Sequence, residues 1–128
     1  MESGTTLKNS RNLLLKLHKV LLDLERDNYE GIHGPVSPTA FLGLLLEDED
    51  YSWLRRFSRL IVDIDEMFDL KDGVTREMVD ERLEKVKELV RMVDPDEFFR
   101  AKYEFFISRS PEAAALQNQL ESLLADEE

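Results

Sequence analysis

Four polar side chains follow one line along the first predicted helix, and they are the strongest candidates for chemistry in this chain. Arg11, His18 and Glu25 are spaced seven residues apart, and Tyr29 lies one turn beyond Glu25. Because seven residues make about two turns of an α-helix, these side chains share one face. A histidine and a carboxylate that share a face can act as an acid–base pair. Asp65, on a later predicted helix, is the natural partner for His18 or Arg11.

Two interpretations of this polar stripe remain open. The stripe lies between two apolar faces of the helix, one around Leu17 and Leu21 and one formed by Leu15 and Leu22. Polar groups that are buried between such faces must bond to one another, so the stripe is expected to be a network that sets the helix register. In the alternative, the stripe is one wall of a pocket, and its ligand-binding residues are Arg11, His18, Glu25, Tyr29 and Asp65.

The sequence predicts no catalytic residue, no metal site and no cofactor. No nucleophile and no glycine-rich phosphate-binding loop accompanies the stripe, so we expect that the protein is not an enzyme. Glu30 and His33 have the Glu-x-x-His spacing of di-iron bundles, but those bundles need two such motifs and two further carboxylates. The chain has no cysteine, which excludes thiolate ligands and disulfides.

A second group of residues is predicted to form a surface for a protein partner. Trp53 and Arg56 belong to residue types that are enriched at binding hot spots, although Trp53 also suits a core. The segment 95–108 is aromatic on two faces, of which a small monomer cannot easily cover both. Phe99, Tyr103 and Phe106 on one of these faces are therefore candidate interface residues, and a homodimer is one expected outcome.

Charge and hydropathy limit the classes of partner. The chain of 128 residues has 28 acidic and 17 basic residues, a net charge of −11. This charge repels phosphate backbones and anionic lipids, so we expect no nucleic-acid and no membrane partner. A negative net charge of this size is typical of highly soluble proteins and of proteins adapted to a salt-rich cytoplasm. It would also suit a surface that docks a basic partner. No apolar run is long enough to span a membrane and no leader is recognised, which favours a cytoplasmic protein.

Hydrophobic periodicity predicts helices and no strands. Apolar residues recur every three or four positions, and Gly, Pro and acidic residues separate the segments. The predicted helices cover about 6–30, 38–46, 51–70, 75–93, 95–108 and 111–124. The fold class is therefore all-α, a single compact bundle of five or six helices that spans 1–128. In this bundle 6–30 is central and packs against 51–70 and 75–93.

The two ends of the chain are predicted to be the least ordered parts. Residues 1–5 and about 125–128 are small, polar or acidic and are expected to be frayed. The segment 111–128 has five acids and no base, which indicates a weakly packed or exchangeable terminus.

The first half of the chain resembles an uncharacterised family of small bacterial all-helical proteins. The residues that carry the resemblance are Leu17-His18-Lys19, Glu25-Arg26, Tyr29-Glu30, His33-Gly34, Trp53-Leu54-Arg55, Ser58, Leu60-Ile61 and Ile64-Asp65-Glu66. The resemblance covers about 13–66 and implies a bacterial cytoplasmic origin. It implies no activity, substrate or cofactor.

The sequence favours a non-enzymatic interaction or accessory module with an acidic surface. The alternative is a helical bundle that binds a small molecule in a pocket lined by His18, Glu25, Tyr29 and Asp65. A structural network would show each of these groups bonded. A pocket would show them around a common cavity.

Overall fold

The chain folds into helices joined by short loops. The computed structural model describes residues 2–126, and all regular secondary structure within them is helical. The elements are α1 (Glu2–His33), α2 (Pro38–Glu47), the 3-10 turn η1 (Glu49–Tyr51), α3 (Ser52–Phe68), α4 (Arg76–Val90), α5 (Glu97–Ile107) and α6 (Pro111–Ala125). The prediction of a single all-α bundle is confirmed.

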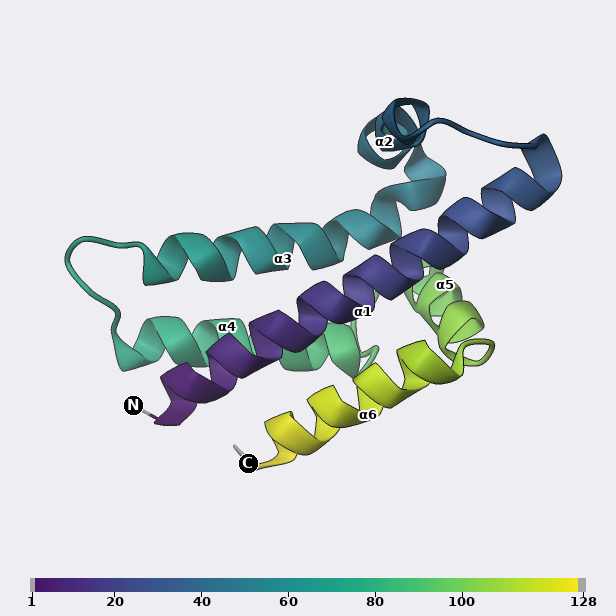
Figure 1. The fold of residues 1–128 in the computed structure, drawn as a ribbon. Helices are drawn as coiled ribbons and strands as arrows, with labels where there is room; N and C mark the ends of the chain where they lie inside the picture. Colours follow the sequence, from purple (N-terminus) through teal and green to yellow (C-terminus); the bar gives the residue numbers. More distant parts are fainter. Residues whose placement is uncertain (1, 127–128) are drawn as a thin grey trace.

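The long helix α1 is the centre of the bundle. It crosses the whole molecule and packs against α3, α4 and α6 (Figure 1). Its buried face includes Leu7, Leu14, Leu17 and Leu21, none of which has any exposed area. The predicted contacts with α3 and α4 are present, and α6 adds a third partner. Although α6 was expected to be weakly packed, its residues Ala113, Leu120 and Leu124 are completely buried.

The ends of α1 differ from the prediction by a few residues. The helix begins at Glu2, and Ser3 and Gly4 are already buried, so the segment expected to be frayed is helical from residue 2 onward. At the other end α1 continues through Gly31 and stops at Gly34. Gly34 has a φ of 86°, which suits glycine, and its N–H donates to the carbonyl of Glu30 at 2.8 Å. Residues 1 and 127–128 lie outside the described part of the chain.

Side-chain caps start α2 and α6 where the sequence predicts helix starts. The hydroxyl of Ser37 accepts the N–H of Ala40 at 3.1 Å, and the hydroxyl of Ser110 accepts that of Ala113 at 3.1 Å. Each of these caps is followed by a proline, which suits the first helical position. Helix α4 ends earlier than predicted, at Val90, so Val93 lies outside the helix and is exposed.

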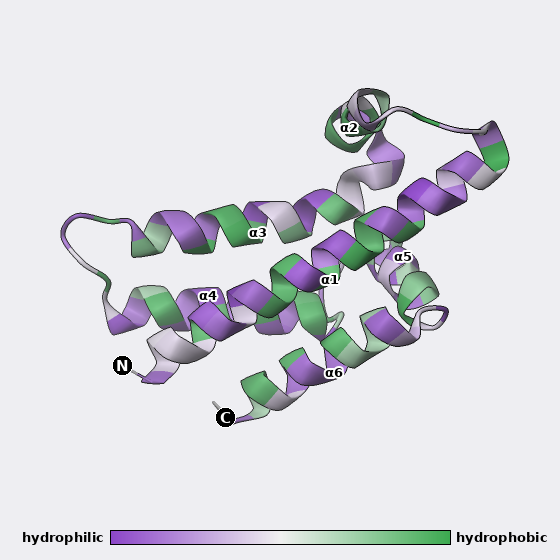
Figure 2. Ribbon diagram, in the orientation of Figure 1, coloured by the Kyte–Doolittle hydropathy of each residue, from purple (hydrophilic) through white to green (hydrophobic). Residues whose placement is uncertain are grey.

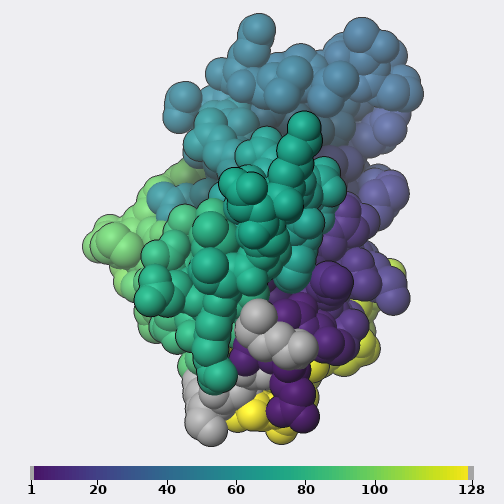
Figure 3. All heavy atoms as spheres, turned by 90° about the vertical axis from the view of Figure 1, so that its left-hand side faces the viewer, coloured from purple at the N-terminus to yellow at the C-terminus, as the bar shows by residue number. Residues whose placement is uncertain are grey.

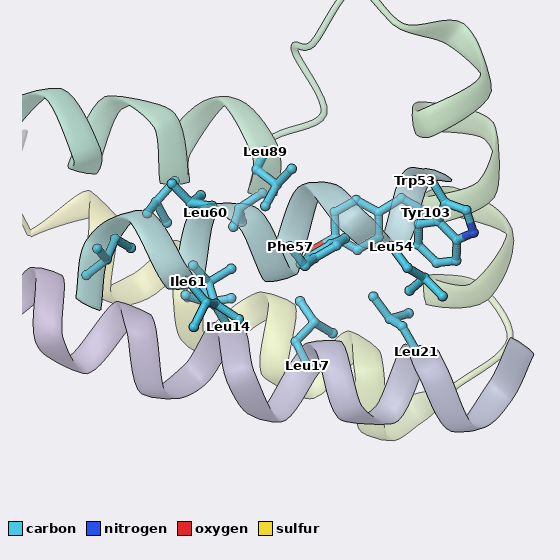
Figure 4. Packing of buried hydrophobic residues seen from close by; sticks show 14 of the residues in the cluster. Leu14, Leu17, Leu21, Trp53, Leu54, Phe57, Leu60, Ile61, Leu89 and Tyr103 are labelled. Carbon is cyan, nitrogen blue, oxygen red and sulfur yellow. The ribbon is translucent and has the colours of Figure 1, made fainter. Parts of the chain in front are cut away.

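The core is built from buried residues of all the helices, most of them on α1, α3, α4, α5 and α6. Leu14, Leu17 and Leu21 of α1 point toward Phe57 and neighbouring residues of α3 (Figure 4). Along α1, α3 and α4, apolar residues recur in short stretches that alternate with hydrophilic ones (Figure 2). This pattern is expected for helices that bury one face and expose the other.

Helix α2 lies apart from the main bundle. It packs mainly against η1 and α3, at the end of the molecule where α1 terminates (Figure 1). In the space-filling view the α2 region forms the upper part of the molecule, above α3 and α4 (Figure 3). Phe41 is its one buried residue. Most of the α2 surface is therefore free to contact another molecule.

Candidate functional site

The polar stripe of α1 does not form one site, because each of its residues has a different environment. Arg11 binds Asp65 of α3 through two hydrogen bonds of 2.9 Å, from Nε to Oδ1 and from Nη2 to Oδ2. Both side chains are partly exposed. Asp65 thus has Arg11 as its partner, and it is not part of a pocket with His18.

Glu25 is a buried carboxylate in the core. The residue is 1% exposed, and its Oε2 accepts the indole N–H of Trp53 at 2.9 Å. The ammonium of Lys102 on α5 lies 3.4 Å from the same oxygen. Glu25 therefore joins α1, α3 and α5 through one charged group, which is the kind of partnered network that the first interpretation of the stripe predicts.

Tyr29 packs among rings at the C-terminal end of α1. Its ring centre lies 4.5 Å from that of His33 and 6.4 Å from that of Phe41 in α2. Nearby, the Glu30 carboxylate accepts the N–H of Val36 at 2.9 Å, and Arg26 donates to the Val36 carbonyl at 2.8 Å. These contacts attach the turn after Gly34 to α1. Glu30 and His33 have structural roles here.

His18 differs from Arg11, Glu25 and Tyr29 because it borders a groove that none of these three lines. It is partly buried, with its ring 6.3 Å from that of Phe57, and burial lowers the pKa of its imidazole. It borders a groove of about 660 Å³ between α1 and α6. The apolar lining includes Leu15, Leu22 and Leu116, and Lys16 and Lys19 are also at the groove. Glu25, Tyr29 and Asp65 do not line this groove, so the predicted pocket is not assembled.

The aromatic residues predicted to form an interface lie in the core. Trp53, Phe99 and Tyr103 have no exposed area, and Phe106 is 5% exposed. Trp53 stacks on Phe106 with ring centres 5.7 Å apart. This placement does not fit a partner surface, because a side chain without exposed area cannot contact a partner.

Arg56 is held within the molecule. Its guanidinium binds the carboxylate of Asp94, donates to Asp96 at 2.8 Å and lies 5.1 Å from the ring centre of Phe99. These contacts attach α3 to the loop before α5. Asp96 also caps α5, and the backbone N–H of Phe99, together with Arg56, lowers the pKa of its carboxyl group.

The outer face of α5 is partly covered by cationic side chains. Phe98 and Phe105 are 43% and 42% exposed. Lys102 lies 5.9 Å above the ring of Phe98, and Arg109 lies 3.7 Å from that of Phe105. Such cation–π contacts cover aromatic surface without a second subunit. A homodimer was expected because one aromatic face of α5 had no other cover. The cationic side chains supply part of that cover within one chain.

The candidate surface that sequence reasoning missed is the exposed face of α2. Leu42 is 52% exposed and Leu46 is 64% exposed. The other exposed residues of α2 before Glu47 are Pro38, Thr39, Ala40 and Gly43, all uncharged. The sequence contained an indication of this surface. A ten-residue helix that is apolar on nearly every side cannot bury all of its sides, so one apolar side must remain exposed.

The described residues contain no metal cluster and no membrane span. No group of three or more His, Asp or Glu side chains within 2–126 is placed to hold a metal ion. Across the same residues, none of the helices combines the length and the hydropathy required to cross a lipid bilayer.

Comparisons of the chain with protein-family models, with curated proteins and with solved structures give no match. The resemblance to a bacterial family therefore stays a prediction.

Proposed function

We propose that this protein is a non-enzymatic interaction module whose α2 surface docks a partner protein through a basic amphipathic helix of that partner. One observation carries the proposal: Leu42 and Leu46 are more than half exposed on a helix that has no charge before Glu47. The predicted cytoplasmic location and bacterial origin remain part of the proposal, and they rest on composition and on the sequence resemblance alone.

The α2 surface is presented by a well-anchored helix. Phe41 is buried against Tyr51 with ring centres 5.8 Å apart, and Arg55 donates to the carbonyl of Leu45 at 2.8 Å. Single exposed leucines are ordinary on protein surfaces. Leu42 and Leu46 are instead one turn apart on a face without charge, which is the spacing that a partner helix contacts.

The charges beside this face indicate a basic partner. Glu47, Glu49 and Asp50 follow the exposed leucines and are themselves exposed. A partner helix with apolar residues on one side and Lys or Arg at its flanks would match both parts of the surface. A second copy of the chain is a poorer match, because each copy has a net charge of −11.

Binding of a labelled amphipathic peptide made of Leu and Lys would test the proposal. We expect fluorescence anisotropy to show binding to the wild type, with affinity reduced at least tenfold by Leu42→Ser with Leu46→Ser. The matched control is Val62→Ser with Leu70→Ser, which removes two other exposed apolar residues. If the control weakens binding equally, the α2 surface is not the docking site.

The oligomeric state tests the choice of partner. Sedimentation velocity should show a monomer for the wild type. A dimer that Leu42→Ser with Leu46→Ser dissociates would overturn the basic partner and assign the α2 surface to self-association.

A further inference from the structure

Helix α2 has few of the interactions that keep a short helix folded. It has ten residues, and an isolated helix of fewer than about 12–15 residues is only marginally stable in water. It packs mainly against η1 and α3, at one end of the molecule (Figure 1). Phe41 is its one buried residue. The stability of α2 therefore depends on a small number of tertiary contacts.

Gly43, in the middle of α2, weakens the helix further. A glycine inside a helix is less favourable than an alanine, because it loses more conformational freedom when it becomes ordered. A Cβ added at Gly43 would meet no atom within 4 Å beyond the adjacent residues and the backbone of the helix. The φ of Gly43 is not positive, unlike those of Gly34 and Gly73. Neither packing nor backbone conformation requires glycine here, so the low intrinsic stability of α2 is not imposed by the fold.

Within residues 2–126, Arg55 is the one side chain of another helix that hydrogen-bonds to α2. Its guanidinium donates to the carbonyl of Leu45 at 2.8 Å and to that of Asp48, just after α2, at 3.4 Å. The Leu45 carbonyl lies in the last turn of α2, where no intrahelical donor is available. A positive charge is favourable at the C-terminal end of α2 but unfavourable in the first turn of α3, where Arg55 lies. The position of Arg55 is therefore explained by its contact with α2.

The chain on both sides of α2 allows the helix to unfold without disturbing the bundle. Ser37 before α2 and Asp48 after it have extended backbone. The turn that precedes Ser37 is held on α1, because Arg26 donates to the carbonyl of Val36 at 2.8 Å and Glu30 accepts its N–H at 2.9 Å. Unfolding of α2 would thus expose Phe41 and leave the contacts among α1, α3, α4, α5 and α6 in place.

We propose that α2 unfolds and refolds as a separate unit while the rest of the bundle stays folded, and that Arg55 controls this equilibrium. In the closed state α2 is helical and packed on α3, and in the open state it is unfolded. Leu42 and Leu46 are one turn apart only while α2 is helical, so the α2 surface exists only in the closed state. The consequence for docking rests on the proposed function. A partner that binds the closed state stabilises it by mass action.

Hydrogen exchange of individual backbone amides, measured by NMR on the whole chain, tests the role of Arg55. In the wild type, the amides of α2 should exchange faster than those of α1 around Leu17, because they exchange through local unfolding. Arg55→Gln should raise the exchange rates in α2 about tenfold and leave those in α1 and α4 unchanged. Arg55→Lys keeps the charge and one donor, so its effect should be smaller. The matched control is Arg59→Gln, which removes an exposed arginine one turn later on α3 and should not affect α2.

Gly43→Ala tests the same unit in the opposite direction with a variant that stabilises the helix. It should slow exchange in α2 about two- to fivefold. Gly31→Ala in α1 is the matched control, because its added Cβ also has open space, and it should leave α2 unchanged. The proposal is overturned if α2 and the core of α1 exchange at the same rate in the wild type, if Arg55→Gln accelerates exchange in all helices alike, or if Gly43→Ala does not slow exchange in α2.

The peptide of Leu and Lys tests the link between closure and docking. At about 100 times its dissociation constant, the peptide should slow exchange in α2 about a hundredfold and leave the core of α1 unchanged. If the peptide binds the wild type without slowing exchange in α2, the docking surface does not depend on closure, and the proposed control of docking is wrong. If the peptide does not bind, the proposed function fails, whereas exchange in the free protein still decides whether α2 unfolds on its own.

Discussion

At the residue scale, Glu25 is a charged residue of α1 that is buried in the core. A carboxylate in a core is stable only when its oxygens have partners, and Glu25 has the indole N–H of Trp53 and the ammonium of Lys102. Burial also raises the pKa of the neighbouring Tyr51 hydroxyl, and the charge of Glu25 adds to this effect. Glu25 thus joins three helices and places a negative charge at their junction.

Glu25→Ala should lower the free energy of unfolding by about 1–3 kcal/mol, because it leaves the Trp53 indole and Lys102 without their partner. Urea titration followed by the fluorescence of Trp53, the single tryptophan, would measure this loss. Lys102→Met keeps the bond to Trp53 and should cost less. An unchanged midpoint for Glu25→Ala would contradict the structural role.

His18→Leu should be neutral or stabilising at pH 7, because the imidazole makes no hydrogen bond in the described residues and leucine adds apolar area. Burial lowers the pKa of His18 in the folded state, so the unfolded state takes up the proton more readily. Wild-type stability should therefore fall as the pH decreases from about 7 through the unfolded pKa of about 6.5 toward the lower folded pKa.

Urea midpoints between pH 7 and pH 5 would measure this effect of His18. The His18→Leu variant should lose less stability than the wild type over this range, and His33→Gln should behave like the wild type. Parallel pH curves for His18→Leu and the wild type would contradict the argument.

At the scale of the elements, α6 is an integral part of the bundle. Gln117 of α6 donates to the carbonyl of Val90 at 2.6 Å, and its own amide oxygen accepts the hydroxyl of Tyr103. The first bond satisfies a carbonyl at the end of α4, where no intrahelical donor is available. Burial raises the pKa of the Tyr103 hydroxyl, and the charge of Glu121 adds to this shift. These contacts join α4, α5 and α6.

Leu120→Ala should therefore lower the free energy of unfolding by about 2–5 kcal/mol, since it creates a cavity at a fully buried position between α6 and its neighbours. Thermal unfolding followed by circular dichroism would measure the change. Leu123→Ala on the same helix removes the same atoms from a partly exposed position and should cost much less. Equal losses for both variants would argue against tight packing of α6.

At the scale of the whole molecule, charge repulsion opposes the compact state. The structure places opposite charges together where helices meet, as in the pairs Arg11–Asp65, Arg82–Asp63 and Arg91–Glu121. Such pairs offset part of the repulsion. The excess of 28 acidic over 17 basic residues leaves a net charge of −11 that ion pairing cannot remove.

The melting temperature should rise as NaCl increases from low concentration to about 1 M, because salt screens the repulsion between surface acids. Differential scanning calorimetry would measure the rise. Glu47→Gln with Glu66→Gln and Glu77→Gln removes three exposed acids and should reduce the dependence on salt. A flat response of the wild type would contradict both this argument and adaptation to a salt-rich environment.

Much of the fold could be predicted from local information. The apolar repeat of Leu14, Leu17 and Leu21 predicts a central α1, and the caps at Ser37 and Ser110 predict two helix starts. These features depend on the periodicity of a helix and on hydrogen bonds between near neighbours, so the sequence contains them. The predicted positions of the helix ends were less accurate. Helix α4 ends at Val90, and the backbone turns two residues later at Met92, which has a φ of 57°.

The sequence by itself determined the all-α class, the buried face of α1 and the polar stripe on it. Only the tertiary structure decided what each polar residue contacts: Glu25 binds Trp53, Arg11 binds Asp65, and His18 borders the groove beside α6. The physical reason is that helical spacing places side chains on a face but does not say which helix lies opposite. Which helix lies opposite depends on how all the helices pack together. This packing places the four residues of the stripe in four different environments.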